Sequence, residues 1–190
     1  MVGKLIVTAI LGLAAYGQEL KPVIDNERVR VWDVTWTKGQ TNPAGRDRDV
    51  VVMWLTGAKA GTASFSAKPG NTGARSLIIE LKDHPVPPLE NKTGYPLAFP
   101  RPHVKKLLEN NRVIVWSYRW NPGEPTPMHF HDKDVVVVYL EDTALTSTTP
   151  DGAKRLNEYK AYDVRFNKRD RTHTELLDRG TGSAMMMELK

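Results

Sequence analysis

The sequence contains no cysteine among its 190 residues. This absence excludes disulfide scaffolds, thiolate zinc sites, iron–sulfur clusters and cysteine nucleophiles. The chain also lacks a run of basic residues, because its 27 Lys and Arg are spread among 22 Asp and Glu and no more than two are consecutive. A phosphate backbone is bound by a basic stripe or patch, so we expect no nucleic-acid partner. Gly-x-Ser-x-Gly, Gly-x-Gly-x-x-Gly and P-loop patterns are absent as well.

No stretch of the sequence is apolar for the roughly 20 residues that a membrane-spanning helix needs, so we expect no membrane span. The apolar run at 5–15 has the length of the hydrophobic region of a secretory signal. Small residues at Ala15 and Gly17 suit cleavage before Gln18. We therefore expect residues 1–17 to be a signal peptide and the protein to be exported, either to a periplasm or outside the cell. The alternative is a buried first strand or helix.

An internal repeat organises the rest of the chain. One set of residues recurs 84 positions later, with Arg28, Val29, Val31, Trp32, Trp36 and Gly39 matched by Arg112, Val113, Val115, Trp116, Trp120 and Gly123. The match continues at an offset of 85, where residues 49–52 correspond to residues 134–137. Such matches predict two copies of one supersecondary unit. We expect a shortened first copy at 18–82, a Pro-rich connector at 83–106 and a complete second copy at 107–190.

The repeated unit is predicted to be all-β. Apolar and polar residues roughly alternate in 29–36 and 113–120, which is typical of half-buried strands. The valine-rich runs at 50–55 and 135–140 suit strands that are covered on both faces. Further strands are expected at 144–148, 155–159, 161–166, 172–177 and 184–189, and a helical turn or two at 104–110. The paired tryptophans lie four residues apart on one strand face, so we expect core packing or contact between the copies rather than a substrate-stacking surface.

Three of the five histidines form the strongest chemical signal. His129 and His131 are two residues apart, so both imidazoles project to one face of a strand. His173 lies on a later predicted strand that converges on that face if the sheet closes into a barrel. Three neutral imidazoles suit Fe, Mn, Ni, Zn or Cu and leave coordination positions open. The alternative is that these histidines are polar residues of a pocket or of the surface, as we expect for His84 and His103 in the connector.

Residues 123–131 consist of a Gly, five further residues and then His-x-His, which resembles the first cupin motif. Residues 166–173 end in His173 and resemble the second motif. The resemblance implies an RmlC-like jelly roll, the double-stranded β-helix or β-barrel of the cupins, with the two copies arranged as a bicupin whose first copy is degenerate. It also implies one divalent transition metal bound by His129, His131 and His173. The family's usual glutamate is replaced by valine, and the nearest acid is Asp134.

Asp134 has two alternative roles. A bulge in the strand would turn its carboxylate toward the histidines as a ligand. On a regular strand it faces the opposite way, and Asp49 occupies the same place in the copy without histidines, which favours a structural role. Lys168, Arg169 and Arg171 precede His173. Of these, Arg171 is two residues from His173 and faces the same way, so it is our candidate contact for an anionic ligand.

Two functions of different classes fit these residues. The first is a metal-dependent oxygenase or related small-molecule enzyme, which the histidine trio favours. The second is a non-catalytic cupin module that binds a small ligand, which the missing glutamate and the histidine-free first copy favour. Either is expected as a monomer or a homodimer. The shortened first copy has too few strands to close a barrel, so we expect residues 18–100 not to fold alone.

Overall fold

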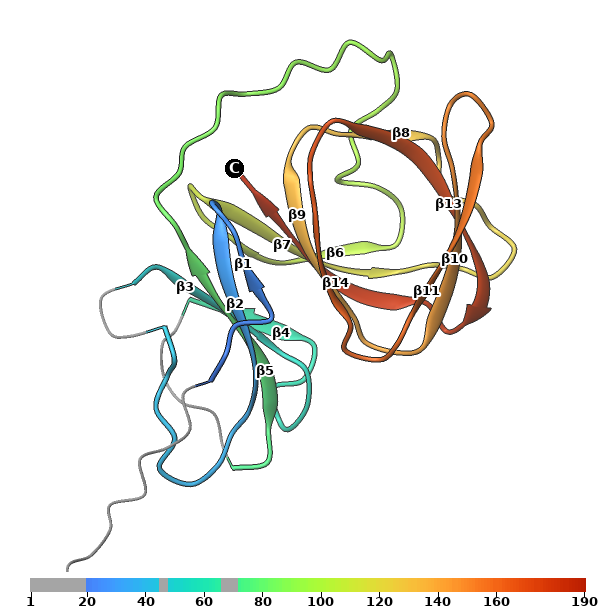
Figure 1. The fold of residues 1–190 in the computed structure, drawn as a ribbon. Coiled ribbons are helices and arrows are strands. Elements are labelled where there is room, and N and C mark those ends of the chain that lie inside the picture. Colours follow the sequence, from blue (N-terminus) through green and yellow to red (C-terminus); the bar gives the residue numbers. More distant parts are fainter. Residues whose placement is uncertain (1–19, 45–47, 66–71) are drawn as a thin grey trace, which may run out of the picture.

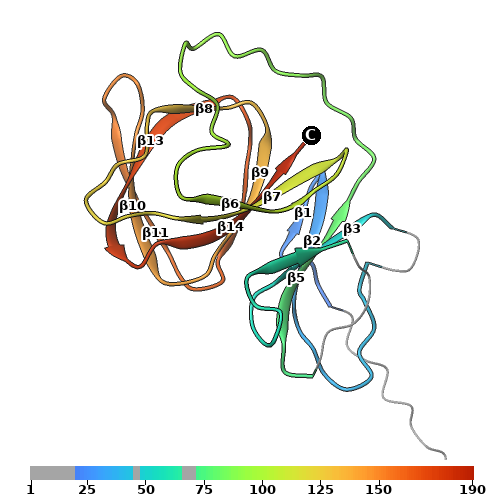
Figure 2. The same cartoon turned by 180° about the vertical axis from the view of Figure 1, so that it is seen from behind.

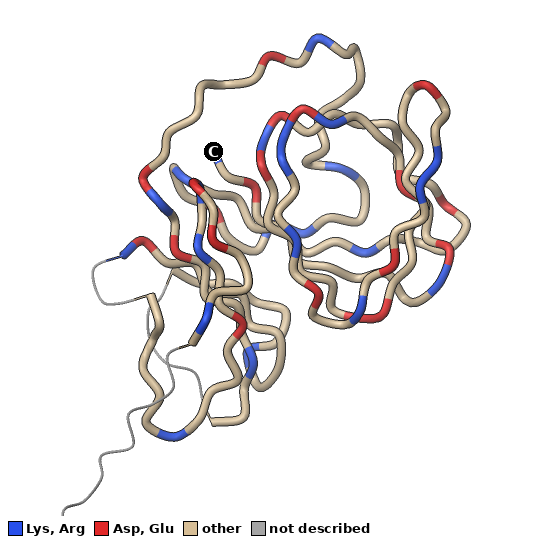
Figure 3. The backbone as a smooth tube through the Cα atoms, viewed as in Figure 1, with Lys and Arg blue, Asp and Glu red and all other residues tan. Residues whose placement is uncertain are grey.

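The computed structural model describes residues 20–44, 48–65 and 72–190, so the expected signal peptide at 1–17 lies outside the described residues. Every secondary-structure element assigned in this part of the chain is a β-strand, and the strands are numbered β1 to β14. The all-β class predicted from the sequence is therefore confirmed. Across the described ranges, no helix is long and apolar enough to cross a membrane. Basic and acidic residues are interspersed over both halves of the tube (Figure 3).

The first half of the chain forms one antiparallel sheet with the strand order β1-β2-β5-β3-β4. Its strands are β1 (Ile24–Asp25), β2 (Val29–Thr35), β3 (Val50–Trp54), β4 (Thr62–Ser64) and β5 (Arg75–Leu81). Within the described residues, no second sheet covers its outer face. The first half is therefore an open sheet, as its shortened sequence predicts.

The second half forms two sheets that close into a ring of strands (Figures 1 and 2). One sheet has the order β12-β9-β14-β7-β6 and the other β11-β10-β13-β8. The strands of the first are β6 (Val104–Glu109), β7 (Val113–Arg119), β9 (Asp134–Tyr139), β12 (Val164–Asn167) and β14 (Ser183–Leu189). Those of the second are β8 (His129–His131), β10 (Thr143–Thr148), β11 (Lys154–Tyr159) and β13 (Arg171–Gly180).

The central strands of the two five-stranded sheets have the same arrangement. Strand β5 lies between β2 and β3, and β14 lies between β7 and β9. The register also corresponds, because Ile79 pairs with Val31 and Val51 as Met187 pairs with Val115 and Val136. Strands β2 and β7 share one pattern of buried and exposed positions. That the halves are two copies of one cupin unit stays a prediction.

Three apolar cores follow from the valine-rich strands. All residues of β3 and β9 are buried, so both runs are covered on both faces as expected. Along β9, Val136 and Val138 face a central core that both five-stranded sheets build together. Val135 and Val137 face the interior of the barrel. A third core lies on the outer face of the first sheet. The central core therefore joins the two halves into one body.

Reciprocal ion pairs extend this contact between the halves. The Nη1 of Arg28 lies 2.8 Å from Oδ2 of Asp134, and the Nη1 of Arg112 lies 2.7 Å from Oδ2 of Asp49. Each guanidinium also donates a hydrogen bond to a main-chain carbonyl of the opposite half. The two arginines correspond in the sequence repeat, and so do the two aspartates. Each half therefore contributes the same arginine and the same aspartate of the repeat to its contact with the other half.

The tryptophans of the repeat pack into the two outer cores. Trp32 and Trp36 belong to the core outside the first sheet, and Trp116 and Trp120 to the barrel interior. All four are at most 5% exposed. Core packing is therefore confirmed, and the alternative of a contact between the copies is wrong.

The connector between the halves departs from the prediction at its C-terminal end. The helical turn expected at 104–110 is wrong, because β6 pairs antiparallel with β7 there. A segment this short gains few internal hydrogen bonds as a helix, whereas the edge of β7 offers a ladder of partners. The chain after β5 arches over the molecule and turns into the ring of strands (Figures 1 and 2).

Candidate metal centre

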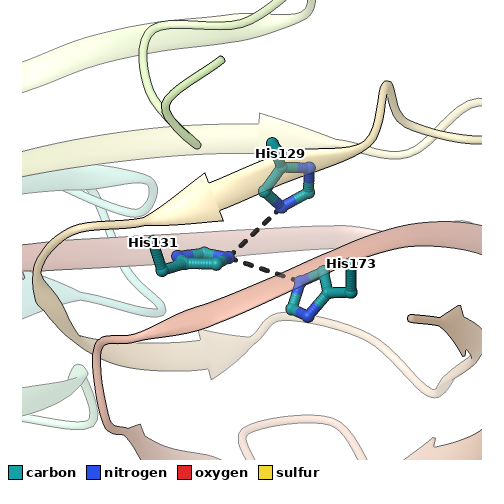
Figure 4. A group of neighbouring side chains, drawn as sticks. All are labelled: His129, His131 and His173. Atoms are coloured by element: carbon teal, nitrogen blue, oxygen red, sulfur yellow. Dashed lines mark hydrogen bonds between the residues drawn. The ribbon is translucent and has the colours of Figure 1, made fainter. Parts of the chain in front are cut away.

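Two paired strands bring the three predicted histidines together. Strand β8 carries His129 and His131, and β13 places His173 directly opposite His129 in the register. All three are buried, with exposed fractions of 2%, 6% and 8%. Their ring nitrogens point toward one another, as Figure 4 shows. The alternative of surface histidines is therefore excluded for this trio, while the side chains of His84 and His103 are 47% and 52% exposed as expected.

The spacing of the ring nitrogens fits a metal ion. The Nε2 of His131 lies 3.2 Å from Nε2 of His129 and 3.3 Å from Nε2 of His173. One ligand atom from each of the three lies within 4.8 Å of the others. Nitrogens bound to one ion at about 2.0–2.1 Å, with coordination angles near 90–110°, lie roughly 2.8–3.4 Å apart. The donor set present therefore fits a divalent transition metal.

The protonation state of the trio also suits metal binding. Burial, followed by the charge of Arg101, lowers the pKa of His129 to about 4. Burial likewise lowers the pKa of His131 well below its usual value and lowers the pKa of His173. The imidazoles are therefore neutral at pH 7, the form that binds a metal. The Nδ1 of His129 lies 2.7 Å from the carbonyl of Pro127. Nδ1 donates to that oxygen, so the lone pair of His129 is on Nε2.

Asp134 is engaged elsewhere. Its Oδ2 pairs with Arg28, and its Oδ1 accepts a hydrogen bond from the backbone N of Arg169 at 2.9 Å. The candidate metal group found among the described residues contains the three histidines and not Asp134. These contacts favour its structural role, and its part in metal binding stays a question for experiment.

Glu175 is an acid of this site that sequence reasoning missed. Its Oε1 lies 3.8 Å from Nε2 of His173, and its Oε2 accepts a hydrogen bond from Trp120 at 3.1 Å. Burial works to raise the pKa of Glu175, but His173, Arg101 and the Trp120 hydrogen bond outweigh it and lower the pKa overall. The available signal was its position two residues after His173, which places both side chains on one face of β13.

Arg101 is the second missed residue, and it comes from the connector. The connector runs beside β8, where the backbone N of Ala98 donates to Phe130 O at 2.8 Å and the N of Phe130 donates to Pro96 O at 2.8 Å. This pairing leads Arg101 into the barrel, where its Nη1 lies 2.9 Å from Nε2 of His129. No periodic pattern marks an irregular segment, so the sequence gives no signal for this placement.

The site encloses a cavity of about 20 Å³. A cavity of roughly 10–15 Å³ holds one water molecule, so this space admits very small groups only. Arg171 lines it, as its position before His173 predicts, together with Arg101, His131, His173 and Glu175. The walls combine neutral imidazoles, two guanidinium groups and one carboxylate.

Comparisons with known proteins relate the chain to the cupins at the level of fold. No family model matches the sequence. The β-alanine degradation protein BauB of Pseudomonas aeruginosa is 42% identical over 60 residues, which are 32% of this chain. The match covers 59% of the length of BauB. A cupin 2 conserved barrel domain protein from Leptotrichia buccalis superposes with a TM-score of 0.53 over 89% of this chain and 87% of its own, at 11% identity.

A cupin domain from Bordetella pertussis is 24% identical and matches with a TM-score of 0.43, over 52% of this chain and 98% of its own. The polyketide cyclase RemF of Streptomyces resistomycificus is 19% identical, with a TM-score of 0.38 over 55% of this chain and 79% of its own. The all-β topology, the closed barrel and the superposition on the Leptotrichia protein together show the fold. The chain is therefore a cupin-fold protein, built on the RmlC-like double-stranded β-helix.

Proposed function

We propose that this protein binds one divalent transition metal through His129, His131 and His173 and uses it as an oxygenase or related enzyme of small molecules. The observation that carries the proposal is the convergence of three buried, neutral imidazoles from β8 and β13. A bound metal would supply Lewis acidity and, for iron or manganese, redox chemistry.

The residues of the chain have separate tasks in this proposal. The histidines hold the ion, and the Pro127 carbonyl fixes the orientation of the His129 ring. Glu175 is held ionised by its surroundings beside His173 and is the group that accepts a proton from a reacting molecule. Phe99 lies against His131 and stacks on Trp116, so the histidines border on an apolar layer.

The small size of the substrate has two supports. The cavity of about 20 Å³ admits only small groups in this conformation. BauB, the partial relative, is named for the degradation of β-alanine, a small molecule. The alternative function, a non-catalytic module, is favoured by the same narrow cavity, because a small ion or ligand fits there without room for a second reactant.

An oxygen-uptake assay on the reloaded protein tests the proposal. The full chain is loaded with Fe²⁺, Mn²⁺, Ni²⁺ or Zn²⁺ and supplied with a panel of small amino and carboxylic acids, β-alanine included. We expect oxygen uptake with iron or manganese and at least one panel member, and its loss in His131→Ala. The exposed-histidine variant His84→Ala is the matched control. One bound metal with no turnover on any panel member supports the binding module instead.

We also propose that the protein is exported and that residues 1–17 are removed. The support is the apolar run at 5–15 followed by small residues at Ala15 and Gly17. N-terminal sequencing of the protein recovered from its native source should start at Gln18. A start at Met1 or Val2 would contradict export by this route.

A further inference from the structure

Arg101 carries an unused hydrogen-bond donor into the barrel. Its side chain is 6% exposed, and its Nε is a buried atom without an acceptor in the part of the chain that the structure describes. A buried N–H without a partner is costly, because the hydrogen bond that it made to water in the unfolded chain is not replaced. Arg101 also lines the cavity beside the histidines. An orphaned donor at the wall of a cavity indicates that an acceptor is supplied by a ligand.

A second donor of Arg101 is coupled to the proposed metal, so this step rests on the proposed function. The Nη1 of Arg101 donates to Nε2 of His129 at 2.9 Å. That nitrogen has one lone pair, because Nδ1 carries the proton donated to Pro127. A hydrogen bond from Arg101 and a bond to a metal therefore exclude each other at His129. When a metal occupies His129, Nη1 is therefore released from that acceptor and becomes a second donor of Arg101 without a partner on His129.

The charges around the cavity call for an anion. Arg171 lines the same cavity, and its Nε donates to the carbonyl of Lys168 at 2.6 Å. Glu175 is the one carboxylate among the lining residues, so it balances one of the two guanidinium groups. A divalent metal adds further positive charge. Buried charge without a partner is costly, and an anionic ligand removes that cost.

Arg101 is also held in place before any ligand arrives. Its guanidinium lies over the ring of Tyr118 at 4.1 Å and over that of Phe99 at 5.0 Å. Its Nη2 lies 3.5 Å from Oε2 of Glu175. These contacts fix the plane of the group, and a fixed, planar guanidinium matches the two oxygens of a carboxylate.

We propose that Arg101 is the specificity-determining residue of the three-histidine site and that the ligand it selects is a small carboxylate, with Arg171 as the second cationic contact. The carboxylate lies between the metal and the guanidinium of Arg101. The connector therefore contributes the group that distinguishes an anionic ligand from a neutral one of the same shape.

Acetate and its neutral isostere acetamide are the probes, used at constant ionic strength on the full chain loaded with Zn²⁺. Calorimetry gives both affinities, and NMR follows the Nε–H signal of Arg101, which is assigned by its disappearance in Arg101→Lys. We expect wild type to bind acetate about tenfold or more tightly than acetamide, with a saturable shift of that signal. Arg101→Gln should lose this preference, Arg171→Gln should weaken it less, and Arg101→Lys should keep part of it.

The surface variant Arg165→Gln is the matched control, because its guanidinium pairs with Asp163 and is 53% exposed. It should bind acetate as wild type does. Thermal melting confirms that each variant is folded. Retention of the acetate preference in folded Arg101→Gln overturns the proposal and shows an anion bound by the metal alone. Failure of wild type to take up zinc overturns the proposed function instead. The NMR titration without metal then decides the inference, since an Nε–H signal that acetate leaves unmoved overturns it.

Discussion

The two five-stranded sheets bury matching side chains toward each other but differ in what covers their outer faces. On the outer face of β2, β5 and β3 lies a core with Trp32, Trp36 and Trp54, which loops cover in the described part of the chain. Behind β7, β14 and β9 lies a second sheet, β11-β10-β13-β8. That added sheet carries all three histidines. Residues shared by the halves build the central core and the contact between the halves, whereas residues present in one half build the site.

This comparison also explains why Asp134 resembles a site residue. It lies three residues after His131, but its counterpart is Asp49, and each pairs with an arginine of the opposite half. Because Asp49 occurs in the copy without histidines, the role that it shares with Asp134 is the ion pair between the halves and not metal binding. The comparison of halves therefore separates structural acids from acids of the site, such as Glu175.

The largest expected effect comes from separating the halves. Residues 18–100 alone would expose the central-core face of the first sheet, including Val31, Val51, Met53 and Ile79, all fully buried in the whole chain. Without that burial the fragment has no stable fold. We expect no cooperative transition when its circular dichroism is followed in urea, in contrast to the full chain. A cooperative transition of the fragment would show that the halves are independent units.

A smaller effect distinguishes the two reciprocal ion pairs. The side chains of Arg28 and Asp134 are 11% and 10% exposed, whereas those of Arg112 and Asp49 are 31% and 67% exposed. Double-mutant cycles with Arg→Gln and Asp→Asn should give a coupling of about 1–3 kcal/mol for the buried pair and below about 1 kcal/mol for the exposed one. Equal couplings would contradict the burial argument.

The same variants decide the role of Asp134. Asp134→Asn should destabilise the fold but leave the zinc content of the protein unchanged, because its oxygens contact Arg28 and Arg169. The matched variant is His173→Ala, which should lose zinc. An Asp134→Asn protein that folds and yet loses as much zinc as His173→Ala would make Asp134 a ligand.

The buried histidines of the second half make the stability of the chain depend on pH. The pKa of His129 is about 4 in the folded chain, against 6.5 for the ordinary imidazole. Between these values the unfolded chain binds a proton that the folded chain does not, so stability falls as pH drops from 6.5 to 4. The slope for this one group is at most about 1.4 kcal/mol per pH unit. Urea unfolding in the presence of a chelator should show a shallower slope for His129→Asn, and an unchanged slope would contradict the assignment.

Much of the fold could be predicted because its signals are periodic. The valine runs gave β3 and β9, and the alternation at 113–120 gave β7, because side chains alternate between faces along a strand. His129 and His131 were found for the same reason, since two residues of separation place both on one face. Such local rules hold wherever a strand is regular.

The missing parts depend on tertiary contacts that no local pattern encodes. Strand β6 exists because β7 offers an open edge, and Arg101 reaches His129 because the connector pairs with Phe130. Arg101 and His129 are 28 positions apart, so this placement follows from the closed barrel rather than from the segment itself.

The central claim is that the chain binds one metal ion, through three histidines that all lie in its second half. Elemental analysis of the full chain tests this claim most directly. Untagged full chain is reloaded with Fe²⁺, Mn²⁺, Ni²⁺ or Zn²⁺, dialysed, and measured beside His131→Ala and the exposed-histidine control His84→Ala. The account predicts one ion per chain for wild type and His84→Ala, and little metal in a folded His131→Ala. Background metal in wild type, or one ion retained by His131→Ala, would contradict it.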